Sequence, residues 1–291
     1  MFHIMKHKTI TWYTVAQCVT AVTVNGNASR VLAGALQEED PMDGTIVDLY
    51  REIERRSTLV DLSPVIQPDM PQMSVHPDLS INHESRSHEM HGYYLQSLLI
   101  SEHHGAHVDA PAHALSDRPE QTIENQPLDR LMGPFKKFDL GRLDPQPGQL
   151  ISRSELEAEA ERAGFELEPG DIALVDFGWS RYYLPDESDW SKRQWWADNN
   201  AGLAEDACAW LSSCGIRAIG SDTVACDLAI MEGEILSQYG HLTYFLPEGI
   251  LIMEGLTRLD ELPATGLFVA LPLKIRNGSG SPLRPVAFVE G

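Results

Sequence analysis

The sequence predicts a single domain of the α/β class, mixed α+β in arrangement, in which helices pack around a mixed β-sheet core. Two observations lead to this class. Short apolar runs typical of buried strands recur along the chain, at 172–177, 216–219, 250–253 and 267–271. Helical patterns at 154–163 and 203–213 lie among these runs without strict alternation, which argues against a repeating βαβ array.

The other elements follow from local patterns. Ile46, Leu49 and Ile53 recur at helical spacing and predict a helix over 45–56. Ser154 and Glu157 have the pattern of a capping box, so the helix at 154–163 is expected to begin there. Further strands are expected at 58–62, 79–82 and 93–100, and glycines at 164 and 215 are expected to end the two later helices.

The chain has 291 residues, enough for one large domain. We expect residues 41–291 to form that domain and residues 1–40 to be a disordered N-terminal extension. Lys6 and Lys8 precede a mildly apolar stretch, 10–24, so a weak signal peptide remains the alternative for this extension. No stretch of the sequence is long and apolar enough to span a bilayer.

Composition excludes several classes of partner. Forty-three acidic residues against 22 basic ones give a net charge of −21, which repels nucleic acid and anionic membranes. The four cysteines, at 18, 208, 214 and 226, form no C-x-x-C pair, so a thiol zinc site is not expected. This cysteine usage fits a reducing, cytoplasmic location.

The segment His103–His113 carries the chemistry. It contains His103, His107, Asp109 and His113, all at odd positions. In an extended chain, side chains alternate faces with a period of two, so these four would share one face. Three imidazoles and a carboxylate on one face are a ligand set suited to zinc or manganese.

A purely structural role for these four residues explains the cluster less well than metal binding does. A single histidine is more often a core or surface residue than a ligand. Four ligand-type side chains within eleven residues, between small residues such as Gly105 and Ala106, are difficult to place as packing residues. Buried without a ligand, they would leave polar groups unsatisfied. We therefore expect a metal site here.

The same segment resembles a known family. The pattern H-x-G-T-H-x-D-x-P-x-H is typical of the cyclase-like metal-dependent hydrolases, which include bacterial kynurenine formamidase and isatin hydrolase, and the segment 103–113 matches it except at Ala106. The resemblance extends over about residues 57–291 through further short motifs. They are Asp61-Leu62-Ser63, Pro68-Asp69-Met70-Pro71, Ile219–Thr223, Ile252–Leu256, Pro272–Ile275 and Gly280–Arg284.

The resemblance implies roles for particular residues, and a mixed sheet core of the cyclase type. His103, His107 and Asp109 would hold a first metal ion, and Asp109 would bridge to a second one held by His241 and Glu254. His113 would be the catalytic general acid/base. Zinc is the first expectation and manganese the alternative, as one or two ions.

The activity implied is hydrolysis of a small amide or lactam, isatin-like or an N-acyl arylamine, by a metal-activated hydroxide. Two departures from the family pattern bear on it. Met73 stands roughly where formamidases of the family have a substrate-contacting aromatic residue, which disfavours N-formylkynurenine as substrate. Ala106 lacks the hydroxyl of the usual threonine, which removes a potential hydrogen bond behind the ligands.

Two alternatives remain open. The same metal site would serve a lactone or ester hydrolase, or a cyclase or dehydratase. A non-catalytic metal-binding protein is the third hypothesis, and an intact His113 argues against it. The expected partners are a small-molecule substrate and further copies of the chain, as a homodimer or homotetramer. The tryptophans at 179, 190, 195 and 196 are either a packing cluster at a subunit contact or an aromatic substrate wall.

Overall fold

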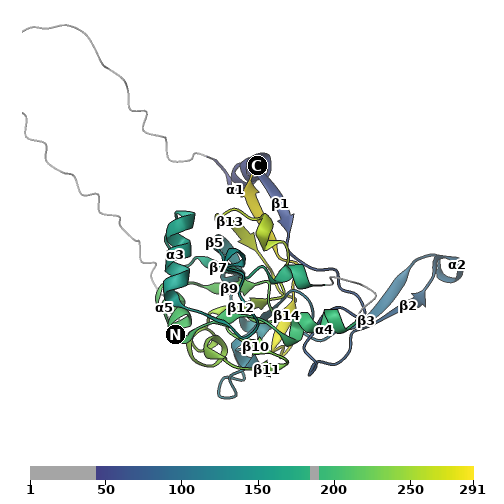
Figure 1. The fold of residues 1–291 in the computed structure, drawn as a ribbon. Helices are drawn as coiled ribbons and strands as arrows, with labels where there is room; N and C mark the ends of the chain where they lie inside the picture. The colour runs from purple at the N-terminus through teal and green to yellow at the C-terminus, as the bar shows by residue number, and fades with distance from the viewer. Residues whose placement is uncertain (1–43, 184–189) are drawn as a thin grey trace, which may run out of the picture. The chain divides into compact units, whose positions relative to one another are not determined.

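A computed structural model describes residues 44–183 and 190–291. The expectation for residues 1–40 therefore lies outside the described residues. Within them, a nine-stranded mixed sheet forms the centre of the domain (Figure 1). Its strands, in spatial order, are β1 (Ser57–Asp61), β15 (Val286–Glu290), β13 (Thr265–Val269), β5 (Met132–Asp139), β7 (Ile172–Asp176), β9 (Ala218–Ser221), β12 (Leu251–Glu254), β4 (His107–Asp109) and β14 (Gly280–Pro282).

The pairing in this sheet is parallel from β5 through β7 and β9 to β12, and antiparallel elsewhere. This arrangement confirms the predicted mixed sheet. Strand β7 shows why its sequence is continuously apolar: Ala173 and Val175 enter one buried cluster, whereas Ile172 and Leu174 enter a second cluster. A strand with both faces buried reads as an apolar run rather than an alternation.

Helices α3 (Arg153–Ala163) and α5 (Glu205–Ser213) supply Leu156 and Leu211 to the first of these clusters. Both helices appear where the sequence predicts them, but the cap of α3 differs. Ser152 rather than Ser154 is the N-cap, and Glu155 accepts hydrogen bonds from its hydroxyl at 2.7 Å and its backbone N–H at 2.8 Å. The sequence carries two overlapping S-x-x-E patterns, and the chain uses the earlier one.

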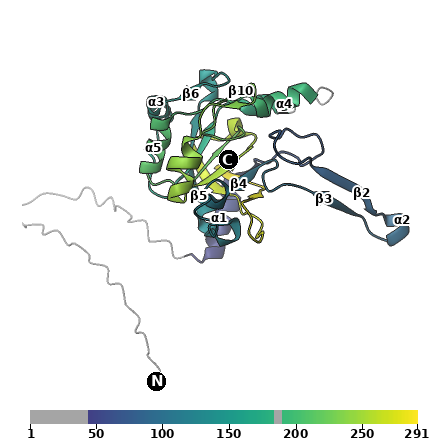
Figure 2. The same ribbon diagram turned by 90° about the horizontal axis from the view of Figure 1, so that it is seen from below.

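A two-stranded ribbon extends away from the large sheet. It consists of β2 (Ser80–Arg86) and β3 (Leu95–Leu99), with the short helix α2 (His88–His91) at its tip, and both views show it projecting (Figures 1 and 2). Leu98 and Leu99 are 51% and 68% exposed on it. Strands usually bury their apolar side chains against another layer, but on this ribbon Leu98 and Leu99 are exposed. A two-stranded ribbon on its own is only marginally stable in water.

The remaining elements are short or peripheral. Helix α1 (Ile46–Arg56) is confirmed where the helical spacing predicts it, yet it buries no residue, and Ile46 is 81% exposed. Helix α4 (Trp190–Asp198) and two small sheets, β6 (Leu150–Ile151) with β8 (Gly202–Leu203) and β10 (Ile230–Met231) with β11 (Glu234–Ile235), complete the set. Across the described ranges, no helix has the length and hydropathy required to cross a membrane.

Candidate metal centre

Strand β4 carries two residues of the site. It pairs with β12 on one side and β14 on the other, and its His107 and Asp109 project to the same side. In the register with β12, His107 is the direct partner of Glu254. The pairing places the His107 Nε2 atom 3.1 Å from the Glu254 Oε2 atom. Two residues 147 positions apart in the sequence thus become neighbours through one strand pairing.

His103 and His113 reach the site by other routes. The chain turns at Gly105, which has a φ of +67°, and His113 lies in the 3-10 helix Pro111–His113. The expectation of one extended face therefore holds for His107 and Asp109 but is wrong for the segment as a whole. His103 also needs the glycine at 280, since a Cβ there would lie 2.6 Å from the His103 Cε1 atom.

Asp109 is the centre of the cluster. Its Oδ1 atom lies 2.7 Å from His103 Nδ1 and 3.6 Å from His107 Nε2. Its Oδ2 atom lies 3.3 Å from His241 Nε2 and 3.9 Å from His113 Nε2. The structure thus brings together all the residues that the sequence and the resemblance nominate.

His241 comes from a separate turn, Gly240–Tyr244, and is buried. Its Nε2 atom lies 3.4 Å from Glu254 Oε1. Asp227 holds the other side of the residue: its Oδ1 atom accepts from His241 Nδ1 at 2.7 Å, and its Oδ2 atom accepts from the His241 backbone N–H at 2.9 Å. Asp227 was not among the residues that the sequence nominated.

His103 and His107 are also oriented by hydrogen bonds, as His241 is by Asp227. The Nε2 atom of His103 hydrogen-bonds Ser279 Oγ at 2.8 Å, and that hydroxyl donates to Glu102 Oε2 at 2.7 Å. The Nδ1 atom of His107 donates to the Gly105 carbonyl at 2.9 Å. In each case one ring nitrogen is fixed by a partner, and the other faces Asp109. This is the usual arrangement around metal-ligating histidines.

The donor set fits a divalent cation. The Nε2 atom of His107 and the Oε1 atom of Glu254 are buried and have no hydrogen-bond partner. Two groups of side chains have ligand atoms within 4.8 Å of one another: His103 with Asp109 and His113, and His107 with Asp109 and Glu254. Nitrogen and oxygen ligands of this kind suit zinc and manganese.

The electrostatics of the metal-free cluster are those of tightly packed opposite charges. Burial works against a charged His107, but Glu254 and Asp109 outweigh it and raise the pKa of His107 to about 9. Burial also opposes the Asp109 carboxylate, yet its contacts with His103 and His241 hold its pKa well below the usual value. Burial lowers the pKa of His113, which keeps this imidazole neutral near pH 7.

A narrow cavity of about 30 Å³ adjoins this cluster. Its lining includes His103, His107, Glu254 and Met73. Three further residues line the cavity: His76, Tyr183 and Trp196. The sequence offered Trp196 as part of a possible aromatic substrate wall, but it did not nominate His76 or Tyr183. Burial and the neighbouring His103 lower the pKa of His76 to about 4.

The tryptophans divide between packing and the cavity. The ring of Trp179, fully buried, stacks on Trp195 at a centroid distance of 5.9 Å. Trp196 lines the cavity and contacts the ring of Tyr183 edge-on at 5.0 Å. The side chain of Trp190 lies outside the described residues. Trp179 and Trp195 thus pack against each other within the domain, whereas Trp196 lies where a substrate wall would be.

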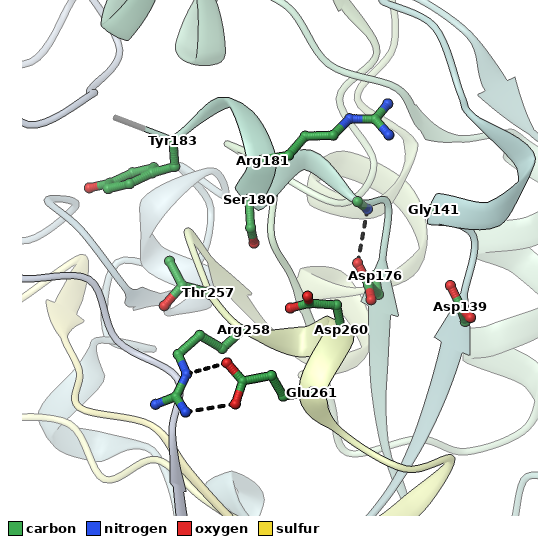
Figure 3. A pocket seen from close by; sticks show the side chains of 11 residues that line it. Asp139, Gly141, Asp176, Ser180, Arg181, Tyr183, Thr257, Arg258, Asp260 and Glu261 are labelled. Atoms are coloured by element: carbon green, nitrogen blue, oxygen red, sulfur yellow. Dashed lines mark hydrogen bonds and ion pairs between the residues drawn. The ribbon is translucent and has the colours of Figure 1, made fainter. Parts of the chain in front are cut away.

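A larger hollow of about 560 Å³ lies beside the ends of β5 and β7 (Figure 3). It is lined by Asp139, Asp176 and Tyr183, and by Arg258, which pairs with Glu261 at 2.7 Å. Asp176 accepts from the Gly178 backbone N–H at 2.9 Å. No histidine is among its described lining residues, so the catalytic chemistry is assigned to the smaller cavity.

Comparison with known proteins agrees with this geometry. The family model described as putative cyclase matches residues 60–228. An isatin hydrolase from Roseibium aggregatum is 25% identical over 242 residues, covering 79% of this chain and 91% of that protein. A kynurenine formamidase from Salinibacter ruber is 30% identical over 197 residues, covering 66% of this chain and 78% of that protein.

The fold has solved counterparts. The crystal structure of an isatin hydrolase bound to the product analogue thioisatinate superimposes with a TM-score of 0.74 at 23% identity, covering 84% of this chain and 98% of the other. The resemblance seen in the histidine segment is thereby confirmed over most of the described chain. The protein belongs to the cyclase family, and the relatives that it matches are hydrolases.

Proposed function

We propose that this protein is a metal-dependent hydrolase that opens the C–N bond of a small amide or lactam. One observation carries the proposal: the ligand atoms of His107 and Glu254, both buried and without a hydrogen-bond partner, lie on paired strands around the Asp109 carboxylate. The similarity to an isatin hydrolase and to kynurenine formamidases supports the choice of bond.

In this proposal, His103, His107 and Asp109 would hold a first divalent ion. His241 and Glu254 would hold a second ion together with Asp109. Zinc is the first choice and manganese the second. The ion supplies Lewis-acid polarisation of the substrate carbonyl and makes water more acidic.

His113 is the proposed proton carrier. Its side chain is 34% exposed, so it reaches solvent, and its ring lies 4.2 Å from that of His103 between centroids, beside the proposed ligands. Burial holds its pKa below the usual value, so the neutral imidazole accepts a proton from water at neutral pH. The same group then delivers that proton to the nitrogen of the leaving amine.

The experiment is elemental analysis of gently purified protein, followed by a hydrolase screen with the metal that is found. The screen compares isatin, a formanilide and matched aryl esters. Turnover of the C–N substrates, abolished by chelation and restored by the metal, is the expected result. Preference for the esters by more than about tenfold would instead assign the ester or lactone alternative.

The role of His113 has its own test. His113→Ala is expected to retain its metal and lose most of its turnover, since general acid/base catalysis contributes roughly 10²–10⁴-fold. Retention of both metal and turnover would exclude His113 as the proton carrier. Absence of any turnover in the unaltered protein, with stoichiometric metal bound, would favour the non-catalytic hypothesis.

We also propose that the protein assembles as a homodimer or homotetramer in the cytoplasm. The exposed apolar side chains of Leu98, Leu99 and helix α1 support self-association. Among the described residues, Cys208, Cys214 and Cys226 are free thiols, which supports a reducing compartment.

A further inference from the structure

The hollow of about 560 Å³ beside the ends of β5 and β7 carries an excess of negative charge (Figure 3). Among the described residues on its wall, the charged side chains are those of Asp139, Asp176, Asp260, Glu261, Arg181 and Arg258. Both guanidinium groups already have a carboxylate partner. Arg258 pairs with Glu261 at 2.7 Å, and Arg181 pairs with Asp144 at 2.8 Å. The positive charges of the wall are therefore neutralised from within the chain.

The remaining carboxylates of this wall differ in their surroundings. Arg162 lies 3.6 Å from Asp139, whereas Asp176 and Asp260 form no ion pair within the part of the chain that the structure describes. Asp260 is exposed, so water solvates its charge. Asp176 is only 3% exposed, and a buried charge without a partner is costly. The unbalanced charge of the hollow thus includes a buried carboxylate.

Asp176 has one oxygen atom without a hydrogen bond. Its Oδ1 atom accepts from the Gly178 backbone N–H at 2.9 Å, but its Oδ2 atom has no such partner among the described residues. Lys137 acts to lower the pKa of Asp176, yet its Nζ atom donates to the Leu259 carbonyl at 3.1 Å. Buried polar atoms are nearly always paired, so this oxygen on the wall of a hollow indicates a ligand that donates a hydrogen bond.

A second buried carboxylate lies next to Asp176. Asp222 is completely buried, and it accepts from the backbone N–H groups of Phe177 and Ser180, both at 2.9 Å. Burial and the nearby Asp176 raise the pKa of Asp222 to about 7, and burial raises the pKa of Asp176 as well. Two buried carboxylates that repel each other favour a cation beside them. Asp222 is not among the lining residues, so the cation would meet Asp176.

The geometry favours an organic cation over a metal ion. Within the described residues, only two groups of side chains have ligand atoms close enough for one ion, and neither includes Asp176. The hollow has the volume of a typical small-molecule pocket. The ring of Tyr183 lies on its wall and gives the apolar part of an organic cation a surface to contact (Figure 3). An ammonium or guanidinium group carries several N–H donors, which can reach separate carboxylates.

We propose that this hollow is a second ligand site, separate from the metal centre, which binds a small organic cation with N–H donors, a primary ammonium or a guanidinium. Asp176 Oδ2 accepts a hydrogen bond from the cation, and Asp260 supplies a second, exposed carboxylate. Tyr183 lines both this hollow and the cavity beside the metal centre, so the two sites share one side chain. The proposal goes beyond the hydrolase function and does not depend on it.

The test is calorimetric titration of the metal-loaded protein at pH 7 with benzylammonium and with benzyl alcohol, its uncharged match. Benzylammonium is expected to bind at least roughly tenfold more tightly, because hydrogen bonds to charged groups are the stronger ones. Absence of binding by benzylammonium, or equal affinity for the alcohol, would overturn the site.

Variants locate the binding. Asp176→Asn keeps the shape of the side chain and the acceptor for Gly178, and it is expected to lower the affinity for benzylammonium by roughly tenfold to a hundredfold. Asp260→Asn, at an exposed position, is expected to lower it by only about two- to fivefold. The matched control is Asp117→Asn, an exposed site outside the hollow. Equal affinity in Asp176→Asn and in the control would place benzylammonium elsewhere and refute the proposal.

Asp260→Asn gives an independent measurement if Asp176→Asn fails to fold, since its side chain is on the surface; an unchanged affinity in this variant would then count against the site. Calcium chloride, titrated in the same way, tests the metal alternative. Calcium binding that Asp176→Asn abolishes would assign the hollow to a metal ion and overturn the organic cation.

Discussion

Both carboxylate oxygens of Asp227 accept hydrogen bonds from a single residue, His241. One bond comes from the backbone N–H and the other from ring Nδ1. Because a carboxylate only accepts, Nδ1 carries a proton. Burial opposes a charged ring, but Asp227, Asp109 and Glu254 outweigh it and raise the pKa of His241 well above its usual value, so without a metal ion Nε2 is protonated as well. When a metal ion displaces the proton on Nε2, Asp227 would keep the other proton on Nδ1 and so hold the tautomer that the proposed metal site requires.

Asp227→Asn is expected to weaken metal binding at the His241 side by roughly 10–100-fold, the usual effect of losing such a partner. Asparagine has one acceptor, which the His241 backbone N–H requires. Its amide would then donate to Nδ1 and move the ring proton to Nε2. The measurement is metal stoichiometry and affinity by calorimetry. Asp117→Asn, an exposed site, is the control, and equal affinities in the two variants would refute this role.

Gly280→Ala is expected to destabilise the metal-free protein by roughly 1–3 kcal/mol, the range typical of overpacking. A Cβ at this position would lie 2.6 Å from His103 Cε1 and 2.6 Å from the Val108 carbonyl oxygen, so strand β14 or the His103 ring must move. Urea unfolding measures the loss. The control is Gly92→Ala, where a Cβ meets nothing within 4 Å and only the positive φ is costly. A smaller loss at Gly280 than at Gly92 would contradict this account.

Metal binding is expected to release protons at pH 7, roughly one or more per ion. In the metal-free protein the pKa of His107 is about 9, so its ring is protonated and must lose a proton before it binds. The apparent affinity should therefore rise by about tenfold per pH unit up to pH 9. Calorimetry in buffers of different ionisation enthalpy counts the protons. An affinity that is flat from pH 7 to 9 would show that His107 is already neutral.

The same residue predicts a stability profile for the metal-free protein. Its folded pKa lies above the ordinary 6.5, so its contribution is complete below pH 6.5 and is lost as the pH rises through 9. The Tm without metal should fall over this interval. In His107→Gln the fall should be smaller, and an identical profile in the variant would assign the effect to another group.

The ribbon of β2 and β3 predicts an effect on assembly. Replacing Leu98 and Leu99 with serine removes two exposed apolar side chains and is expected to shift the protein toward monomer. Light scattering after size exclusion measures the mass. Leu128→Ser, at an exposed site in a different part of the chain, is the control. An unchanged mass in the double variant would exclude the ribbon from the interface.

Many elements of this fold could be predicted from the local sequence, because a buried face gives a helix or strand a regular pattern of apolar residues. The continuous apolar run in β7 predicts a strand covered on both faces, and that is its environment. The cluster His103–His113 was likewise visible as a set of ligand types. The geometry of the cluster was harder to predict. Strand alternation places His107 and Asp109 on one face, whereas the position of His103 depends on a turn at Gly105.

The other residues of the site could not be predicted from local sequence, because they come together only when distant segments pair. Glu254 becomes a neighbour of His107 through strand register, which no local pattern encodes. Asp227 and Ser279 look like ordinary polar loop residues until the fold places them behind His241 and His103. His241 and Glu254 were nominated through family resemblance alone.

The pairing of His107 with Glu254 across β4 and β12 also bears on the lifetime of the chain. An ion held by both residues and by His241, as proposed, would tie together three stretches that are remote in sequence. Such an ion would act as a removable crosslink, since it would bind the folded form and not the unfolded chain. Susceptibility to proteases should therefore track metal supply, so that a cell short of the metal would clear the protein as well as lose its activity.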